Sequence, residues 1–288
     1  MEKVKGSIAA EPVFWPGSIG GRGLGELLVA AMAGGFRKMA ISPLLVHQLL
    51  TSELTPRQII DRAAAAQVTL CELDGVSGWA PVWAPKDAPT ALQERFAFSD
   101  DQCLEMAAAL GIRSILTVGA FDSGKVQTPA IIDSFGRFCD KAARYGLYVE
   151  LEFVPFWGIP DLSAAWEIVQ ITNRDNAGLL IDTWHLQKGS RNFSQDLALL
   201  KALPAGKIRS LQLADARLAP GSDTLYQEGR LRLFPGDGEL SIGEIVDAVR
   251  TNGDLRYIGA EIFGEAIDGL SSTEAGKKSA ESIRTFLE

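Results

Sequence analysis

The sequence predicts a single (β/α)8 barrel that spans all 288 residues. Short apolar runs alternate with helical patterns along the whole chain. Four of the later runs end in a polar residue, and the intervals 152–182 and 182–212 between the first three ends are both 30 residues. That interval suits one strand and its crossover helix. The alternative, an open doubly wound sheet, would favour an early G-x-G-x-x-G segment, and the glycine-rich stretch Gly17–Gly23 lacks that spacing.

Turn and capping residues set the bounds of the first four strand–helix pairs. Thr55 and Pro56 mark the start of a helix, with Thr55 as its N-cap and Pro56 at the first helical position. Pro43 is expected to end the second strand, and Gly111 to end the third helix. A loop rich in Pro and Trp covers Gly75–Thr90. The expected strands are Gly6–Ala10, Phe36–Ile41, Val68–Leu73 and Ser114–Val118, and the helices are Gly23–Ala33, one opening at Thr55, Ser99–Leu110 and Ile131–Tyr145.

The second half of the chain continues the rhythm until one long insertion. Between Gln212 and Glu261 lies a loop rich in Gly, Pro and Arg, Asp215–Gly238, which is long enough to act as a functional lid. The expected strands are Tyr148–Glu152, Gly178–Asp182, Ile208–Gln212 and Tyr257–Glu261, and the helices are Leu162–Asn173, Ser194–Ala202, Ser241–Thr251 and Ser272–Leu287.

Composition narrows the classes of partner. The formal charge of −8 and the pI of about 5.0 argue against a nucleic-acid backbone as ligand. No apolar run approaches the roughly 18 residues of a membrane span, and Met1–Gly6 carries no signal-peptide pattern. Cys71, Cys103 and Cys139 are predicted to be buried free thiols in a reducing compartment, so a cytoplasmic protein is expected. The sequence leaves the oligomeric state open, a homo-oligomer included.

Four strand-end residues predict a metal site. Glu152, Asp182, Gln212 and Glu261 fall at the carboxyl ends of strands, where (β/α)8 barrels place their chemistry. One carboxylate there is more often a helix N-cap or a salt-bridge partner. Four polar side chains at the ends of successive strands weaken that alternative, because burying the three carboxylates among them together is costly without a cation. Carboxylate and amide oxygens suit a hard divalent cation.

Other polar residues surround these positions. His185, three residues after Asp182, is either a solvated loop histidine or a hydrogen-bond donor to a substrate oxygen. Arg217, Arg230 and Arg232 in the long loop are either surface charges or guanidinium forks for an anionic or hydroxylated substrate.

Three further groups have a secondary place in the prediction. Glu150 shares the strand face of Glu152 and is expected to line the barrel interior below the metal or to pair with an arginine. His47 is expected on a helix surface and not at the site. Several aromatic residues near strand ends favour an apolar wall over the site, and Trp184 is among the expected substrate contacts: Phe14, Trp15, Trp79, Trp83, Phe156, Trp157 and Trp184.

The second half of the chain resembles the xylose-isomerase-like TIM-barrel superfamily, the sugar phosphate isomerase/epimerase group. The order and spacing of five segments carry the resemblance, and the strand–helix rhythm extends it over the whole chain. The segments are Leu151–Pro155, Ile181–His185, Leu211–Asp215, Phe234–Gly238 and Ala260–Glu261.

This resemblance implies roles for the four strand-end residues. It implies Glu152, Asp182, Gln212 and Glu261 as ligands of one divalent ion (manganese, magnesium, cobalt or zinc), Glu152 and Glu261 as the acid/base pair, and His185 as a substrate contact. The chain departs from many epimerases of the group in carrying Gln212 where they carry histidine. The ligand set with glutamine resembles that of bacterial 3-dehydroshikimate dehydratases.

The expected activity is isomerisation or epimerisation of a small sugar or polyol ketone. Proton abstraction next to a carbonyl and a metal-stabilised enediolate would carry it. A small polyhydroxy carbonyl compound is the expected partner, with no nucleic acid and no membrane. Expulsion of a β-hydroxyl from the same intermediate gives the alternative, a dehydratase-type lyase. A non-catalytic barrel that binds a metal or a carbohydrate is the third hypothesis.

Overall fold

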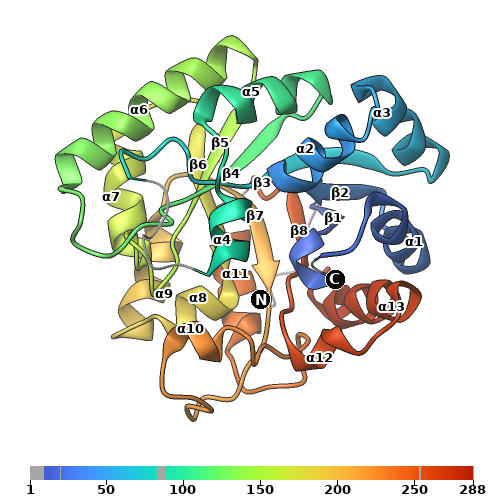
Figure 1. Cartoon of the computed structure of the whole chain (residues 1–288). Helices are drawn as coiled ribbons and strands as arrows, with labels where there is room; N and C mark the ends of the chain where they lie inside the picture. The colour runs from blue at the N-terminus through green and yellow to red at the C-terminus, as the bar shows by residue number, and fades with distance from the viewer. Residues whose placement is uncertain (1–9, 20, 83–88, 253, 288) are drawn as a thin grey trace.

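The computed structural model describes residues 10–19, 21–82, 89–252 and 254–287. Within these residues, eight parallel strands pair in chain order into a closed barrel, and the helices surround it (Figure 1). The (β/α)8 prediction is confirmed. The strands are β1 Glu11–Phe14, β2 Lys38–Ile41, β3 Thr69–Val76, β4 Ser114–Val118, β5 Tyr148–Glu152, β6 Ala177–Asp182, β7 Ile208–Leu213 and β8 Tyr257–Ala260.

The long helices occupy the positions that the sequence predicts, and shorter ones fill the loops. Thr55 and Ser99 form capping boxes at the starts of α3 and α5. The helices are α1 Leu24–Gly34, α2 Pro43–Thr51, α3 Pro56–Ala65, α4 Thr90–Arg95, α5 Asp100–Ala109, α6 Thr128–Arg144, α7 Leu162–Thr172, α8 Thr183–Lys188, α9 Phe193–Ala202, α10 Leu225–Glu228, α11 Ile242–Arg250, α12 Glu265–Asp268 and α13 Ser272–Ile283.

The differences from prediction lie mostly in the first quarter of the chain. The first strand is Glu11–Phe14 and not Gly6–Ala10, of which residues 6–9 lie outside the described part. Pro12 has no N–H to donate to a neighbouring strand, so the local sequence does not favour a strand at these residues. Pro43 does end the second strand, yet it also opens α2, with Ser42 as N-cap. His47 is exposed on α2, as expected.

Successive side chains along each strand point to opposite faces of the barrel wall and so form two hydrophobic cores. The outer core packs between strands and helices. The inner one fills the barrel with Val13, Trp15, Ala40, Cys71, Leu116 and Leu180. A polar layer crosses this interior, where Glu150 Oε1 accepts hydrogen bonds from Ser114 Oγ at 2.7 Å and Ser210 Oγ at 3.0 Å. Glu150 therefore lines the barrel interior as predicted.

The first and last long helices close the outer ring. In Figure 1, α1 and α13 lie side by side. Gly276 allows the approach, because a Cβ at this position would lie 1.9 Å from the carbonyl oxygen of Ala30. The three cysteines are free and buried, as expected. No helix in the described residues has the length and apolarity to span a membrane.

Candidate metal and substrate site

Strand register brings the predicted polar side chains to one end of the barrel. Asp182 on β6 pairs with Gln212 on β7, which pairs with Gly259 on β8. Glu152 ends β5, and Glu261 follows β8 directly. All four residues are at least 94% buried, so the site is largely removed from water.

Asp182 has two structural partners. Its Oδ1 accepts from the backbone N–H of His185 at 2.7 Å, which caps α8. Its Oδ2 accepts from Arg232 Nη1 at 2.8 Å. The N-cap alternative considered from the sequence therefore holds for one oxygen of Asp182, while the other oxygen faces the cluster.

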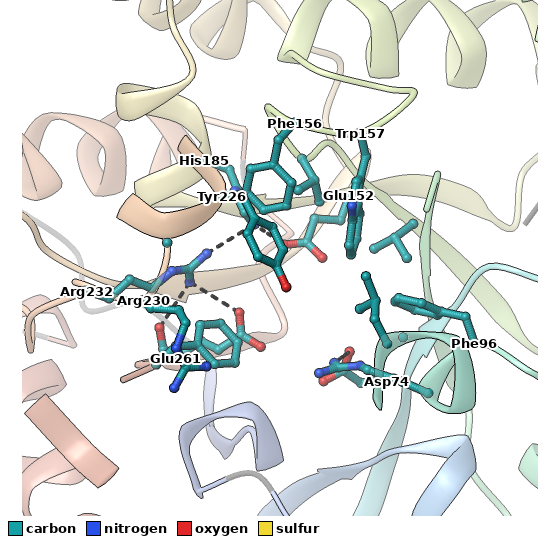
Figure 2. A pocket seen from close by; sticks show the side chains of 17 residues that line it. Asp74, Phe96, Glu152, Phe156, Trp157, His185, Tyr226, Arg230, Arg232 and Glu261 are labelled. Atoms are coloured by element: carbon teal, nitrogen blue, oxygen red, sulfur yellow. Dashed lines mark hydrogen bonds and ion pairs between the residues drawn. The ribbon is translucent and has the colours of Figure 1, made fainter. Parts of the chain in front are cut away.

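Arg232 is the cation in this cluster, and it reaches the barrel from the long loop after β7. Its side chain is 2% exposed. Nη1 lies 3.4 Å from Glu261 Oε2 and 3.1 Å from the Glu261 carbonyl oxygen. Nη2 lies 3.1 Å from His185 Nε2. Figure 2 shows the guanidinium between Glu261 and His185. Removing Arg232 would leave carboxylates buried without their charge partner.

Aromatic rings hold this guanidinium in place. Its Cζ lies 5.1 Å from the ring centroid of Trp184 and 4.8 Å from that of Phe263. Trp184 is fully buried and does not line the cavity, so it supports Arg232 from behind.

Burial dominates the proton affinities of the cluster. It raises the pKa of Glu152 and of Glu261 well above the ordinary value; neighbouring carboxylates add to this, and Arg232 opposes it. Burial lowers the pKa of His185 to about 3, so its imidazole is neutral at pH 7. A neutral imidazole keeps one nitrogen lone pair, and His185 Nε2 lies 3.3 Å from Glu152 Oε1.

The donor set fits a divalent cation. Within the described part of the chain, Glu152, Asp182 and His185 offer ligand atoms that all lie within 4.8 Å of one another. When Glu152, Asp182 and Glu261 are ionised they carry three negative charges, of which Arg232 neutralises one. A divalent ion would neutralise the other two. The geometry therefore admits His185 as a ligand beside two of the predicted ligands, Glu152 and Asp182, whereas Glu261 is not in this group.

Gln212 contacts the cluster from below. One orientation of its amide satisfies both neighbours: the nitrogen donates to Glu261 Oε2 at 3.2 Å, and the oxygen accepts from Trp15 Nε1 at 3.2 Å. Trp15 Nε1 also donates to Glu72 Oε2 at 2.8 Å. Gln212 would have to turn its oxygen away from Trp15 to bind a metal in the predicted way.

A cavity of about 190 Å³ opens above the cluster. One side of the cavity is aromatic. The centroid of the Phe156 ring lies 5.5 Å from that of Trp157, 5.4 Å from that of Tyr226 and 6.2 Å from that of His185. Figure 2 shows these rings around Glu152. The lining consists of Asp74, Gly75, Leu92, Arg95, Phe96, Val118, Glu152, Val154, Phe156, Trp157, His185, Tyr226, Gly229, Arg230, Arg232, Glu261 and Phe263.

The predicted substrate contacts separate into two groups. His185 and Arg232 line the cavity. Arg217 does not: its side chain is 66% exposed and faces Glu239 at 3.7 Å. Arg230 lines the cavity mouth and pairs with Asp268 at 3.2 Å. Of the predicted aromatic wall, Phe156 and Trp157 are in place, and Trp83 lies outside the described residues.

Sequence reasoning missed two charged residues of the lining, Asp74 and Arg95. Asp74 comes directly after the expected strand Val68–Leu73. The strand-end rule that selects Glu152 and Asp182 would therefore have selected Asp74, had it been applied to the first half of the chain. Arg95 ends the short helix α4, and no sequence signal marks it.

Buried charged side chains fix the position of the long loop after β7. Asp215 accepts backbone hydrogen bonds from Gly236 at 3.0 Å and Leu240 at 2.9 Å, which fixes the Phe234–Gly238 turn. Lys188 Nζ lies 3.1 Å from Glu228 Oε2. These contacts position the segment that carries Arg232.

Comparison with known proteins agrees with this architecture. The sequence model of the xylose isomerase-like TIM barrel family matches residues 30–288. The chain belongs to this family. An inosose isomerase of Bacillus subtilis (strain 168) is 26% identical over 178 residues, which are 60% of this chain and 62% of that protein. A 3-dehydroshikimate dehydratase of Pseudomonas aeruginosa is 25% identical over 186 residues, which are 64% of this chain and 28% of that protein.

The solved structures show the same fold. The IolI protein with a bound zinc atom matches 96% of this chain and 98% of its own length with a TM-score of 0.78, at 18% identity. The chain spans about three fifths of the inosose isomerase and about a quarter of the dehydratase. These relatives are enzymes by name.

Proposed function

We propose that this barrel is a divalent-metal-dependent isomerase or epimerase of a small polyol ketone. The observation that carries the proposal is the buried cluster at the cavity floor, in which Asp182 and Glu261 share the guanidinium of Arg232 and Glu152 lies 3.3 Å from His185. The inosose isomerase relatives support a cyclic polyol ketone as the substrate class.

The metal would be held by Glu152, Asp182 and Glu261, with Gln212 or His185 completing the set, and would supply Lewis-acid polarisation of a carbonyl. Glu152 and Glu261 both line the cavity. One carboxylate removes the proton next to the carbonyl, and the other carboxyl returns one.

Arg232 and His185 contact the oxygen atoms of the substrate. The Arg232 guanidinium stabilises negative charge that develops on an oxygen after proton removal. The neutral His185 imidazole contacts a substrate hydroxyl from the same side. Phe156 and Trp157 cover the reacting carbon and exclude water. Arg217 and Trp184 have no direct contact role in this proposal.

A dehydratase is the second candidate, and Gln212 is the observation that favours it. The ligand set with glutamine resembles that of 3-dehydroshikimate dehydratases, and two relatives carry that name. In that reaction the same proton removal is followed by loss of a β-hydroxyl, so the residue roles above are unchanged up to that step.

One experiment separates the two candidates. The manganese-loaded protein is incubated in D2O with an inosose, a ketose or 3-dehydroshikimate, and each mixture is followed by NMR. Deuterium at the carbon next to the carbonyl with an isomeric product supports the isomerase, and loss of water supports the dehydratase. Glu261→Gln is the control and should lose exchange by several orders of magnitude. No exchange with any of the compounds would contradict a catalytic role.

A further inference from the structure

Asp74 and Arg95 form a polar pair that the mechanism above does not use. In Figure 2, Asp74 lies across the open space from Arg232 and Glu261. Its residue is 2% exposed, and both Asp74 and Arg95 line the cavity. Asp74 thus meets the cavity from β3, while the catalytic carboxylates meet it from β5 and β8.

Both members of the pair have unused hydrogen-bonding atoms. Asp74 Oδ1 lies 3.7 Å from Arg95 Nη2, which is too long for a direct hydrogen bond. Among the described residues, no group bonds to Asp74 Oδ2 or to Arg95 Nε, although both atoms are buried. An unpaired acceptor beside an unpaired donor in a binding cavity points to a ligand group that both donates and accepts. A hydroxyl is such a group.

The charges around the cavity decide against a carboxylate at this position. Asp74 and Arg95 neutralise each other. Arg230 faces Asp268 at 3.2 Å, and Arg232 is bonded to Asp182 at 2.8 Å. Every arginine in the described lining therefore already faces a carboxylate. A ligand carboxylate beside Asp74 would face like charge.

The surface next to the pair is apolar. Phe96 follows Arg95 in the chain, and its ring packs on that of Trp157 with the centroids 5.5 Å apart. Val118 and Val154 belong to the same cluster. A cyclic polyol fits both features, because its ring C–H groups can cover the aromatic surface while an equatorial hydroxyl reaches Asp74.

We infer that Asp74 and Arg95 bind a ring hydroxyl of an uncharged polyhydroxy ketone and select it over a ring ketone that carries a carboxylate there. The inference rests on the proposed function, since it concerns the same cavity. It makes Asp74 a specificity-determining residue that meets the substrate from β3.

Calorimetric binding to the full-length, manganese-loaded protein tests the inference. The probes are an inosose, its monodeoxy analogues and 3-dehydroshikimate. The parent should prefer the inosose. Asp74→Asn should weaken inosose binding about tenfold and Asp74→Ala up to about a hundredfold. The matched control is Asp268→Asn, which removes an exposed carboxylate from an arginine of the same cavity and should bind like the parent.

The deoxy analogues distinguish direct contact from altered structure. The analogue that lacks the hydroxyl bound by Asp74 should bind the parent weakly and Asp74→Ala equally weakly. Removing the hydroxyl and removing the carboxylate abolish the same interaction, so the two effects do not add. Asp74→Ala should also gain affinity for 3-dehydroshikimate, and manganese affinity should not change.

An Asp74→Ala variant that binds the inosose as the parent does would overturn the subsite alone. A parent that binds 3-dehydroshikimate more tightly than the inosose would overturn the subsite and would also favour the dehydratase over the proposed isomerase. A parent that binds neither compound would instead overturn the proposed polyol substrate, and the subsite with it.

Discussion

Replacing Arg232 with methionine should destabilise the metal-free protein by about 3–5 kcal/mol. The substitution removes the guanidinium that Asp182 and Glu261 share and keeps a long apolar side chain against Trp184. Breaking a buried ion pair from one side costs about that much, because the remaining carboxylates stay buried without a partner. For a chain of this size, the loss corresponds to a fall in Tm of about 10 °C.

Thermal unfolding with and without Mn²⁺ checks this prediction. Manganese should raise the Tm of Arg232→Met by more than it raises that of the parent, since the cation then meets one more uncompensated carboxylate. Arg217→Met is the matched control: it removes an exposed arginine 3.7 Å from Glu239 and should change the stability by at most about 0.5 kcal/mol. An Arg232→Met variant that melts with the parent in the absence of metal would refute the idea that the cluster depends on this one guanidinium.

Three further predictions concern the cluster and the scaffold. The pKa of Glu152 and of Glu261 in the folded protein lies above the ordinary 4.5, so the metal-free protein should lose stability as pH rises from about 4.5 through the raised values. Manganese should reverse this trend. Urea unfolding from pH 5 to 8 measures the trend, and a metal-free stability that rises with pH would contradict the prediction. Gly276→Ala should cost about 1–3 kcal/mol by forcing a Cβ against the Ala30 carbonyl, measured by chemical denaturation against the exposed Gly243→Ala as control. Gln212→His should shift preference from manganese towards zinc or cobalt, and unchanged selectivity in a competition titration would exclude Gln212 as a ligand.

The fold was predictable because strand and helix patterns are local. The bounds predicted for β4 and β5 match the structure, and those of β6, β7 and β8 differ by one residue at one end. The first strand was missed by five residues at its start because Pro12 hides it. The predicted helices are right where capping residues mark them, and the short helices α4, α8, α10 and α12 carry too few residues for a periodic pattern.

The site was predictable only where it follows from strand ends. Glu152, Asp182 and Glu261 come together because consecutive parallel strands place their carboxyl ends at one rim. The position of Arg232 depends on how the loop after β7 folds back, and three arginines in that loop look alike in sequence. The structure separates them by the backbone contacts of Asp215 and the Lys188–Glu228 pair, which no local pattern encodes.

The proposed metal site and the proposed specificity subsite lie on different strands of the barrel because they need different side chains. The cluster needs several carboxylates on neighbouring strands, and β5 to β8 supply them. A hydroxyl subsite needs one acceptor across the cavity, and β3 supplies Asp74 there. The proposal therefore predicts that changes in β3 and in the helix after it alter the substrate without altering the cluster. On this argument, replacing Asp74 and Arg95 with other residues alters which ketone is bound while leaving the proposed proton-transfer residues and the affinity for manganese unchanged.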